Sequence, residues 1–341
     1  MDENRLKEEQ GGTVKTVLRK WGPWLVTAAI FYFVFQRVPI EKVVDAAIHV
    51  DLRIFLPLLI ANLIIHFLWD ILVYTQLFRW FDTSVTYTEM MPVRGASYML
   101  MVLNFFVGQG GFALLISRWK RLPIKRVTSI LLFTMFNDYY LLLAFCLVGA
   151  FRLPDVDLSC FFKAGEKGDL VRFIVISWAY FWIHIGFYRW HLPRTKRLQQ
   201  FKQSEIASAF LEAPTTLYFK LGAIKLVNFF AGIFICYFAL AAFGIKVPLI
   251  YLFTFLPIVW LIGSIPVTVM GFGTTQAAMI WLVAGFAQGT GSPQKIEAAV
   301  VAYSLLWSFF YGLGNLGAGA ICLSRLPKNI WMPVDLARQD I

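Results

Sequence analysis

SIPVTVMGFGTTQAAMIWL, residues 264–282, is apolar enough for a lipid bilayer, yet Pro266, Gly271 and Gly273 crowd its middle. Proline lacks a backbone donor and glycine permits a positive φ, so the residues predict a break in the helix here. Polar side chains flank this break: Thr268, Thr274, Thr275 and Gln276. Broken backbone survives at membrane depth only where protein or a watery cavity covers it. Such a segment is typical of a transporter's binding site, and a glycine-rich packing face with a proline kink is the alternative.

Composition places the whole chain in a membrane. Of its 341 residues, 59% are hydrophobic and 15% are charged, which excludes an ordinary soluble domain. The excess of 31 Lys and Arg over 20 Asp and Glu lies in clusters between apolar segments, as in cytoplasmic loops, so no nucleic-acid partner is expected. The four cysteines form no CxxC motif, and neither a metal nor another cofactor is expected.

The first half of the chain begins with a polar cytoplasmic segment, residues 1–20, before a retained first helix at Trp24–Phe35. Residues 38–53 are amphipathic and are expected along the outer surface. Ile54–Phe78 is long enough to cross back, and it carries Asn62, His66 and Asp70 on one helix face. These polar groups predict either the lining of a transport path or a hydrogen-bond network that joins helices.

Gly95–Ser117 lies between two basic clusters that both belong in the cytoplasm. A single crossing would leave one cluster outside. We therefore predict a re-entrant hairpin over residues 95–117 that turns at the GQGG sequence, Gly108–Gly111, with Asn104 nearby.

The second half is predicted from the same charge pattern. Val127–Ala150 crosses outward with Asp138 halfway along, residues 151–172 form an external loop, and residues 173–188 cross inward. Residues 203–219 are amphipathic, and Leu221–Phe243 crosses outward with Lys225 near its inner end. The arms at residues 249–262 and 275–287 are short for full crossings, so a second hairpin over residues 249–287 is predicted, with three full crossings as the alternative.

The fold class predicted is an all-α polytopic membrane protein with about six full crossings and two broken hairpins. The first transmembrane repeat covers residues 21–150 and the second covers residues 173–323, followed by a cytoplasmic tail at 324–341. The repeats start on opposite sides of the membrane, and each contains one broken segment. This inverted repeat is typical of transporters with a site near the bilayer midplane.

Residues of about 90–320 resemble the transmembrane flippase-like region of lysylphosphatidylglycerol synthases and their free-standing relatives. The pieces that carry the resemblance are Asn104 with Gly110 and Gly111, the basic run from Arg118, the mid-membrane Asp138, SIPVTVMGFGTTQ at 264–276, and AAVVAYSLLWSFFYGLGNLGAGA at 298–320. The resemblance implies a protein that handles or translocates lipids across the inner membrane. The family's cytosolic aminoacyl-transferase domain has no counterpart here, so synthesis of aminoacylated lipid is not expected.

The chain also departs from that family's pattern. Phe105–Gln109 replaces a segment that often contains proline, and the first basic residue after the glycine pair is Arg118. Tyr139 follows Asp138 where an acid–arginine pair is frequent, and Gln276 stands where Glu is common.

No enzyme motif is convincing. Gly312–Gly317 reads GxGxxG but lies inside an apolar segment with no strand before it, which indicates helix packing. The four histidines lack zinc spacing, and no serine lies in GxSxG. We therefore do not expect an enzyme.

The function predicted is transport of an anionic phospholipid or lipid-linked phosphate through a midplane cavity. The residues assigned to the substrate are Arg94, Asn104, Gly108, Gln109, Gly110, Gly111, Arg118, Lys225, Pro266, Gly271, Gly273, Thr274, Thr275 and Gln276. The hairpin tips would offer backbone N–H groups and the cations would attract phosphate, while any single cation is more ordinarily a snorkelling topology anchor. His66, Asp70 and Asp138 are candidates for proton coupling.

The predicted location is the inner membrane, with both termini in the cytoplasm. Beyond lipid, candidate partners are a second copy of the chain and a separate lipid-synthesising or lipid-accepting protein. Two other classes remain open: a proton-coupled carrier of a small soluble solute, which needs a closed, water-filled cavity, and a membrane-embedded lipid-modifying enzyme, which needs a catalytic cluster.

Overall fold

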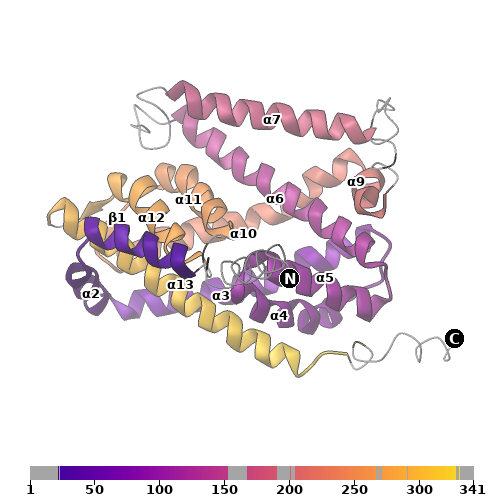
Figure 1. Ribbon diagram of the computed structural model, residues 1–341, viewed down its shortest axis with the longest axis horizontal. Coiled ribbons are helices and arrows are strands. Elements are labelled where there is room, and N and C mark those ends of the chain that lie inside the picture. Colours follow the sequence, from indigo (N-terminus) through magenta and orange to yellow (C-terminus); the bar gives the residue numbers. More distant parts are fainter. Residues whose placement is uncertain are drawn as a thin grey trace, which may run out of the picture.

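The computed structural model describes residues 22, 24–152, 167–189, 200, 204–265, 268, 271–289, 291–327 and 330. These residues are predominantly helical, as the sequence predicts (Figure 1). Residues 1–20, Pro266, and most of both the external loop and the C-terminal tail lie outside the described residues.

The helices of the first half are Trp24–Arg37, α2 (Ile40–Ile48), α3 (Leu52–Trp80), α4 (Tyr87–Leu103), α5 (Phe105–Lys120) and α6 (Ile124–Arg152). The second half contains α7 (Lys167–Arg189), η1 (Glu205–Ala207), α9 (Ser208–Glu212), α10 (Thr215–Ala241), β1 (Ile245–Lys246), α11 (Leu249–Ser264), α12 (Thr274–Leu282), η3 (Ala284–Phe286), β2 (Gln288–Gly289) and α13 (Pro293–Leu323).

Four described helices are long and apolar enough to cross a membrane: Leu52–Trp80, Ile124–Phe145, Thr215–Ala241 and Pro293–Leu323. A crossing needs about 20 residues. Trp24–Arg37, the described part of the predicted first crossing, is shorter than that. The structure is therefore compatible with a membrane-embedded protein, and it shows four long apolar helices where the sequence predicts about six crossings.

The first broken segment turns at Asn104, so the prediction of a turn at GQGG is wrong. Asn104 is extended, with φ −168° and ψ 145°, and its side chain accepts a hydrogen bond from the backbone N–H of Phe106 at 2.8 Å. Asparagine is a favourable N-cap, which explains why α5 begins here. The arms are also longer than predicted, because a Thr86–Glu89 capping box starts α4 and the second arm continues to Lys120.

The GQGG glycines lie inside α5 and let its surface approach α4. A Cβ added to Gly108 would lie 2.1 Å from the side chain of Met101 and 2.9 Å from its backbone. A Cβ added to Gly111 would lie 2.2 Å from the side chain of Leu100. These contacts run antiparallel on either side of Asn104, so the glycines serve to pack the two arms together.

The second broken segment is also a hairpin. α11 and α12 are joined by residues 265–273, where Gly271 and Gly273 have φ of +71° and +87°. Beyond the arms, β1 and β2 pair antiparallel, with Ile245 opposite Gly289. Both ends of the hairpin therefore lie at the same end of the molecule. A re-entrant hairpin and the alternative of three full crossings both bring these ends together, so the choice between them stays a prediction.

Helices far apart in the sequence pack together at the centre. α3 packs on α10, α4 on α13, and α11 on α6 (Figure 1). α4 and α13 approach each other closely at Gly319, because this residue has no side chain. A Cβ added there would lie only 2.9 Å from the backbone nitrogen of Met99. α7 lies along one side of the molecule against α6 and α9.

The two largest hydrophobic clusters each surround one hairpin. The first contains Leu77, Phe112 and Ile116 at the end of the molecule where the basic α5–α6 turn lies. The second contains Phe255 and Leu282 at the opposite end. Each of the long helices α3 and α10 contributes to both clusters. On each of these two helices, the residues between the two clusters include polar side chains.

Candidate functional site

A polar layer lies between the two hydrophobic clusters. Along α3, Phe55 and Leu59 belong to one cluster and Ile71 and Leu77 to the other, with His66 between them. Along α10, Leu221 and Ile233 mark the two clusters, and Lys225 and Asn228 lie between. The layer therefore forms where two long helices pass from one packed half of the molecule to the other.

Asp70 and Arg94 form the centre of this layer. Nε of Arg94 lies 2.6 Å from Oδ2 of Asp70, and the hydroxyl of Tyr98 donates to the same oxygen at 2.7 Å. The Arg94 side chain is 3% exposed, and its guanidinium carbon lies 4.1 Å from the ring centroid of Tyr74. Burial and ring contacts thus fix Arg94 between α3 and the first hairpin.

Gln109 connects α5 to the same network. Its carbonyl oxygen lies 3.5 Å from Nη1 of Arg94, and its amide nitrogen donates to the hydroxyl of Tyr74 at 3.1 Å. Ser97 also lies 3.5 Å from Nη1 of Arg94. The GQGG sequence therefore contributes its amide side chain to the polar layer, besides the packing of its glycines.

A second ion pair joins α6 to α10. Nζ of Lys225 lies 2.5 Å from Oδ1 of Asp138 and donates to the backbone carbonyl of Thr134 at 3.1 Å. The Lys225 side chain is 9% exposed, whereas that of Asp138 is 35% exposed. Asp138 also interacts electrostatically with Asp70 and Arg94, so the two pairs belong to one site.

His66 and Asn228 link the layer to α13. The Asn228 amide lies 2.8 Å from Nδ1 of His66. Because the amide N–H can only donate, Nδ1 accepts, and a neutral His66 then carries its proton on Nε2. The His66 ring centroid lies 6.0 Å from that of Tyr311 and 6.4 Å from that of Tyr98.

Charges in the layer are balanced. The two cations, Arg94 and Lys225, each hold one carboxylate, and breaking a buried pair by removing one partner costs about 3–5 kcal/mol. In this conformation neither cation is available to a lipid phosphate. A ligand anion would have to replace a carboxylate.

The tip of the second hairpin is satisfied largely by its own residues. The carbonyl oxygen of the Gln276 side chain accepts from the N–H of Gly273 at 2.6 Å, and the Thr274 hydroxyl donates to the carbonyl of Gly271 at 3.0 Å. The amide nitrogen of Gln276 is buried and has no hydrogen-bond partner among the described residues. A Cβ on Gly273 would lie 3.2 Å from Ile30, so the first helix covers this tip.

The structure gathers only part of the predicted site. Arg94, Gln109 and Lys225 join the three candidates for proton coupling in the polar layer. Arg118 is exposed in the last turn of α5, and Gly110 is exposed as well. Gly271, Thr274, Thr275 and Gln276 lie at the other hairpin tip, whose binding role remains a prediction. Pro266 lies outside the described residues.

Tyr74 and Tyr98 contribute to the layer but are absent from the predicted site. Each lies four residues after a predicted charge, Asp70 or Arg94, and therefore on the same helix face. That spacing is a signal that the sequence carries. Without the packing of α3 on the hairpin, it does not distinguish these tyrosines from lipid-facing aromatics.

No family model, curated protein or solved structure matches the chain. Within the described parts, no group of three His, Cys, Asp or Glu side chains could hold a metal ion.

Proposed function

We propose that this chain is a lipid transporter that passes the headgroup of an anionic phospholipid through the polar layer between its two hairpins. The observation that carries this proposal is the presence of two buried or half-buried ion pairs in the layer between two separately packed halves. Ionisable groups at membrane depth are expensive and usually serve a pathway. The resemblance to the flippase-like family points to lipid as the cargo.

The packing pattern supports an inverted repeat. In this arrangement α3, the first hairpin and α6 correspond to α10, the second hairpin and α13. α3 and α10 pack on each other, and each hairpin's first arm packs on the last helix of the other repeat, α4 on α13 and α11 on α6. Each hairpin therefore packs on the other repeat. This arrangement is consistent with a transporter whose two halves move against each other around the polar layer.

The distribution of charge supports the orientation that we propose, with the basic end in the cytoplasm of an inner membrane. The turn between α5 and α6 and its surroundings carry Arg118, Lys120, Arg121, Lys125 and Arg126. At the other end, Arg37 pairs with Glu297 at 2.7 Å.

Asp138 is the group that we assign to coupling. Protonation of its carboxylate would release Lys225 from the ion pair and leave its ammonium group for the lipid phosphate. Return of the proton to water would restore the pair and displace the phosphate. The partly exposed Asp138 side chain makes this exchange accessible, whereas the more deeply buried Asp70–Arg94 pair serves as a fixed support.

The experiment is fluorescent-lipid translocation in proteoliposomes, with the outer-leaflet label removed chemically. We expect Asp138→Asn, which mimics the protonated carboxyl, to transport without dependence on a pH gradient. Adding Lys225→Met to this variant removes the phosphate partner without leaving a buried carboxylate, and the rate should fall at least about tenfold. Lys220→Met is the matched control, because Lys220 is exposed on the same helix.

Equal rates for the double variant and the control would contradict the role of Lys225. Translocation no faster than in protein-free vesicles, for both an anionic and a zwitterionic lipid, would contradict lipid transport itself and favour a soluble solute.

A further inference from the structure

An apolar groove of about 330 Å³ lies between α6, α7 and the segment of η1 and α9. Its lining residues are Leu132, Met135, Phe136, Tyr188, Ile206 and Phe210. The volume is at the lower end of the range for small-molecule sites, about 300–1,000 Å³. None of these lining residues takes part in either ion pair of the polar layer.

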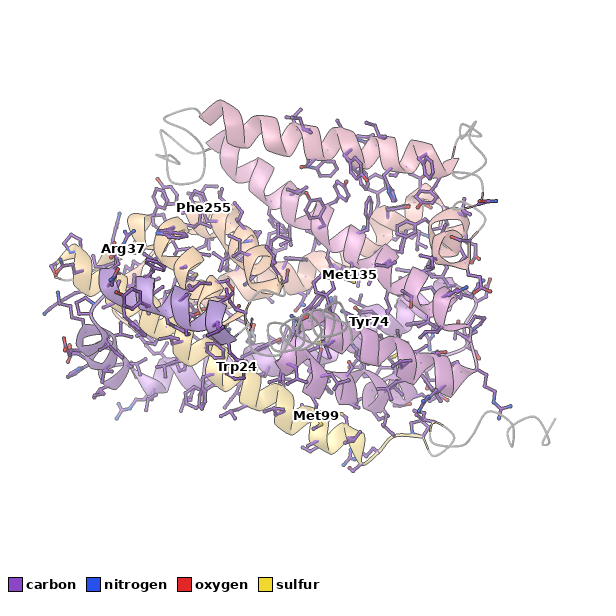
Figure 2. All side chains as sticks on the ribbon, viewed as in Figure 1. Trp24, Arg37, Tyr74, Met99, Met135 and Phe255 are labelled. Atoms are coloured by element: carbon purple, nitrogen blue, oxygen red, sulfur yellow. The ribbon has the colours of Figure 1, made fainter. Side chains whose placement is uncertain are left out.

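Stacked rings give the groove a firm wall. The His184 and Phe136 ring centroids are 3.8 Å apart, and the rings of Tyr188 and Phe210 are stacked at 5.2 Å. Figure 2 shows aromatic side chains between α6 and α7. The rim is open, because Leu132 is 38% exposed and Ile206 is 39% exposed.

With Arg126 at the membrane surface, as the proposed orientation places it, the position of the groove along α6 would fit one leaflet of a bilayer. An α-helix rises about 1.5 Å per residue, so Leu132 and Phe136 lie about 9 and 15 Å along α6 from Arg126. Half of the hydrocarbon core is about 15 Å thick. Arg126 and Glu212 form a bidentate ion pair at 3.0 and 3.1 Å, which marks the polar end of the groove. In that placement the groove would run from the Arg126–Glu212 pair into the hydrocarbon.

A cation stands at the same end. Lys125 is exposed beside Arg126 and has no ion pair among the described residues. An exposed Lys at the head of an apolar groove complements a phosphate that is joined to an acyl chain.

We propose that this groove holds one acyl chain of an anionic glycerophospholipid from the leaflet at the basic end, with the lipid phosphate beside Lys125. The site is separate from the transport path. It would anchor α7 and α9 to α6 through a bound lipid, and it stands whether or not the chain transports lipid.

The test is native mass spectrometry of the full-length purified protein, titrated with phosphatidylglycerol or phosphatidylcholine of identical chains. We expect one phosphatidylglycerol per chain to bind in preference to phosphatidylcholine. Ile206→Trp at the open rim should weaken binding about tenfold, which equals the loss of roughly two methylenes of contact. Phe238→Trp, at a 52% exposed position of α10 away from the groove, is the control.

Lys125→Gln should reduce the preference for phosphatidylglycerol about fivefold, and Lys220→Gln should leave it unchanged. Met135→Trp, which fills the groove from inside, tests the site a second time if Ile206→Trp fails to fold. Equal binding by Ile206→Trp and Phe238→Trp, or no bound lipid in the wild type, would overturn the groove as a lipid site. Equal binding of the two lipids by the wild type would overturn the role of Lys125.

Discussion

The two hairpins have the same backbone plan and opposite chemistry. The first carries Glu89, Arg94, Arg118 and Lys120, whereas residues 249–287 of the second contain no charged residue. The first turns at Asn104, whereas residues 265–273 connect the arms of the second, with Gly271 and Gly273 at positive φ. The first contributes Arg94 and Gln109 to the polar layer, while the second uses Gln276 to satisfy its own tip.

This difference indicates a division of labour. The first hairpin is held by a charge on another helix, because Arg94 binds Asp70 of α3. The second is held by its backbone geometry and by the β1–β2 pairing at its base. The first should therefore respond to loss of charge as well as to loss of glycine, whereas the second should respond to loss of glycine alone.

The largest effect is expected for Arg94→Met. It leaves Asp70 buried without its cation, and we expect a loss of about 3–5 kcal/mol in the free energy of unfolding. Thermal unfolding in detergent measures it. Arg118→Met, at an exposed position of the same hairpin, is the control and should change little. If the two variants unfold at the same temperature, the charge of Arg94 does not hold the first hairpin in place.

Gly108→Ala tests the packing between the arms of the first hairpin. The added methyl group would lie 2.9 Å from the backbone of Met101, which can yield only by separating α4 from α5. We expect a destabilisation of about 1–3 kcal/mol. At Gly110, an added Cβ would meet no described atom within 4 Å, so Gly110→Ala should be neutral or slightly stabilising. A neutral Gly108→Ala would contradict the close packing.

Gly273→Ala tests the backbone geometry of the second hairpin. A φ of +87° is unfavourable for alanine, and the new methyl group would also press on Ile30 at 3.2 Å. The expected cost is about 1–2 kcal/mol by the same unfolding assay. Gly285→Ala in η3 is the control, since its Cβ would meet no described atom within 4 Å. Equal unfolding temperatures for Gly273→Ala and Gly285→Ala would contradict this prediction and show that the backbone at the tip can adjust to alanine.

The smallest effect concerns the start of the first hairpin. Hydrogen bonds from the backbone N–H and the hydroxyl of Thr86, both at 2.8 Å, lower the pKa of Glu89 below its ordinary 4.5. The stabilisation is therefore present above that value and is lost as the pH falls through the lowered pKa. Because Glu89 is exposed, its size should be no more than about 0.5 kcal/mol.

Hydrogen exchange of the backbone amides at the N-terminus of α4, measured from pH 6 downward, reports the loss of the stabilisation by the Glu89 carboxylate. Glu89→Gln keeps a capping group without the charge and should remove the pH dependence. A dependence that persists in Glu89→Gln would assign it to another carboxyl.

Much of this molecule follows from the sequence alone. Apolar length predicts the long helices, and the basic clusters on both sides of residues 95–117 predict a segment that turns back on itself, as α4 and α5 do at Asn104. The fourfold spacing of Asn62, His66 and Asp70 predicts one polar helix face, because helical periodicity is a local property. Glycine and proline likewise mark the second break.

Tertiary structure decided the rest. Glycines in GQGG suit a turn and close packing equally well, and only the approach of Met101 to Gly108 shows that they pack the arms, leaving the turn to Asn104. Arg94 reads as a cytoplasmic anchor until α4 brings it against Asp70, 24 residues away, and Lys225 meets Asp138 across 87 residues. These partners depend on long-range packing of helices, which local periodicity does not encode.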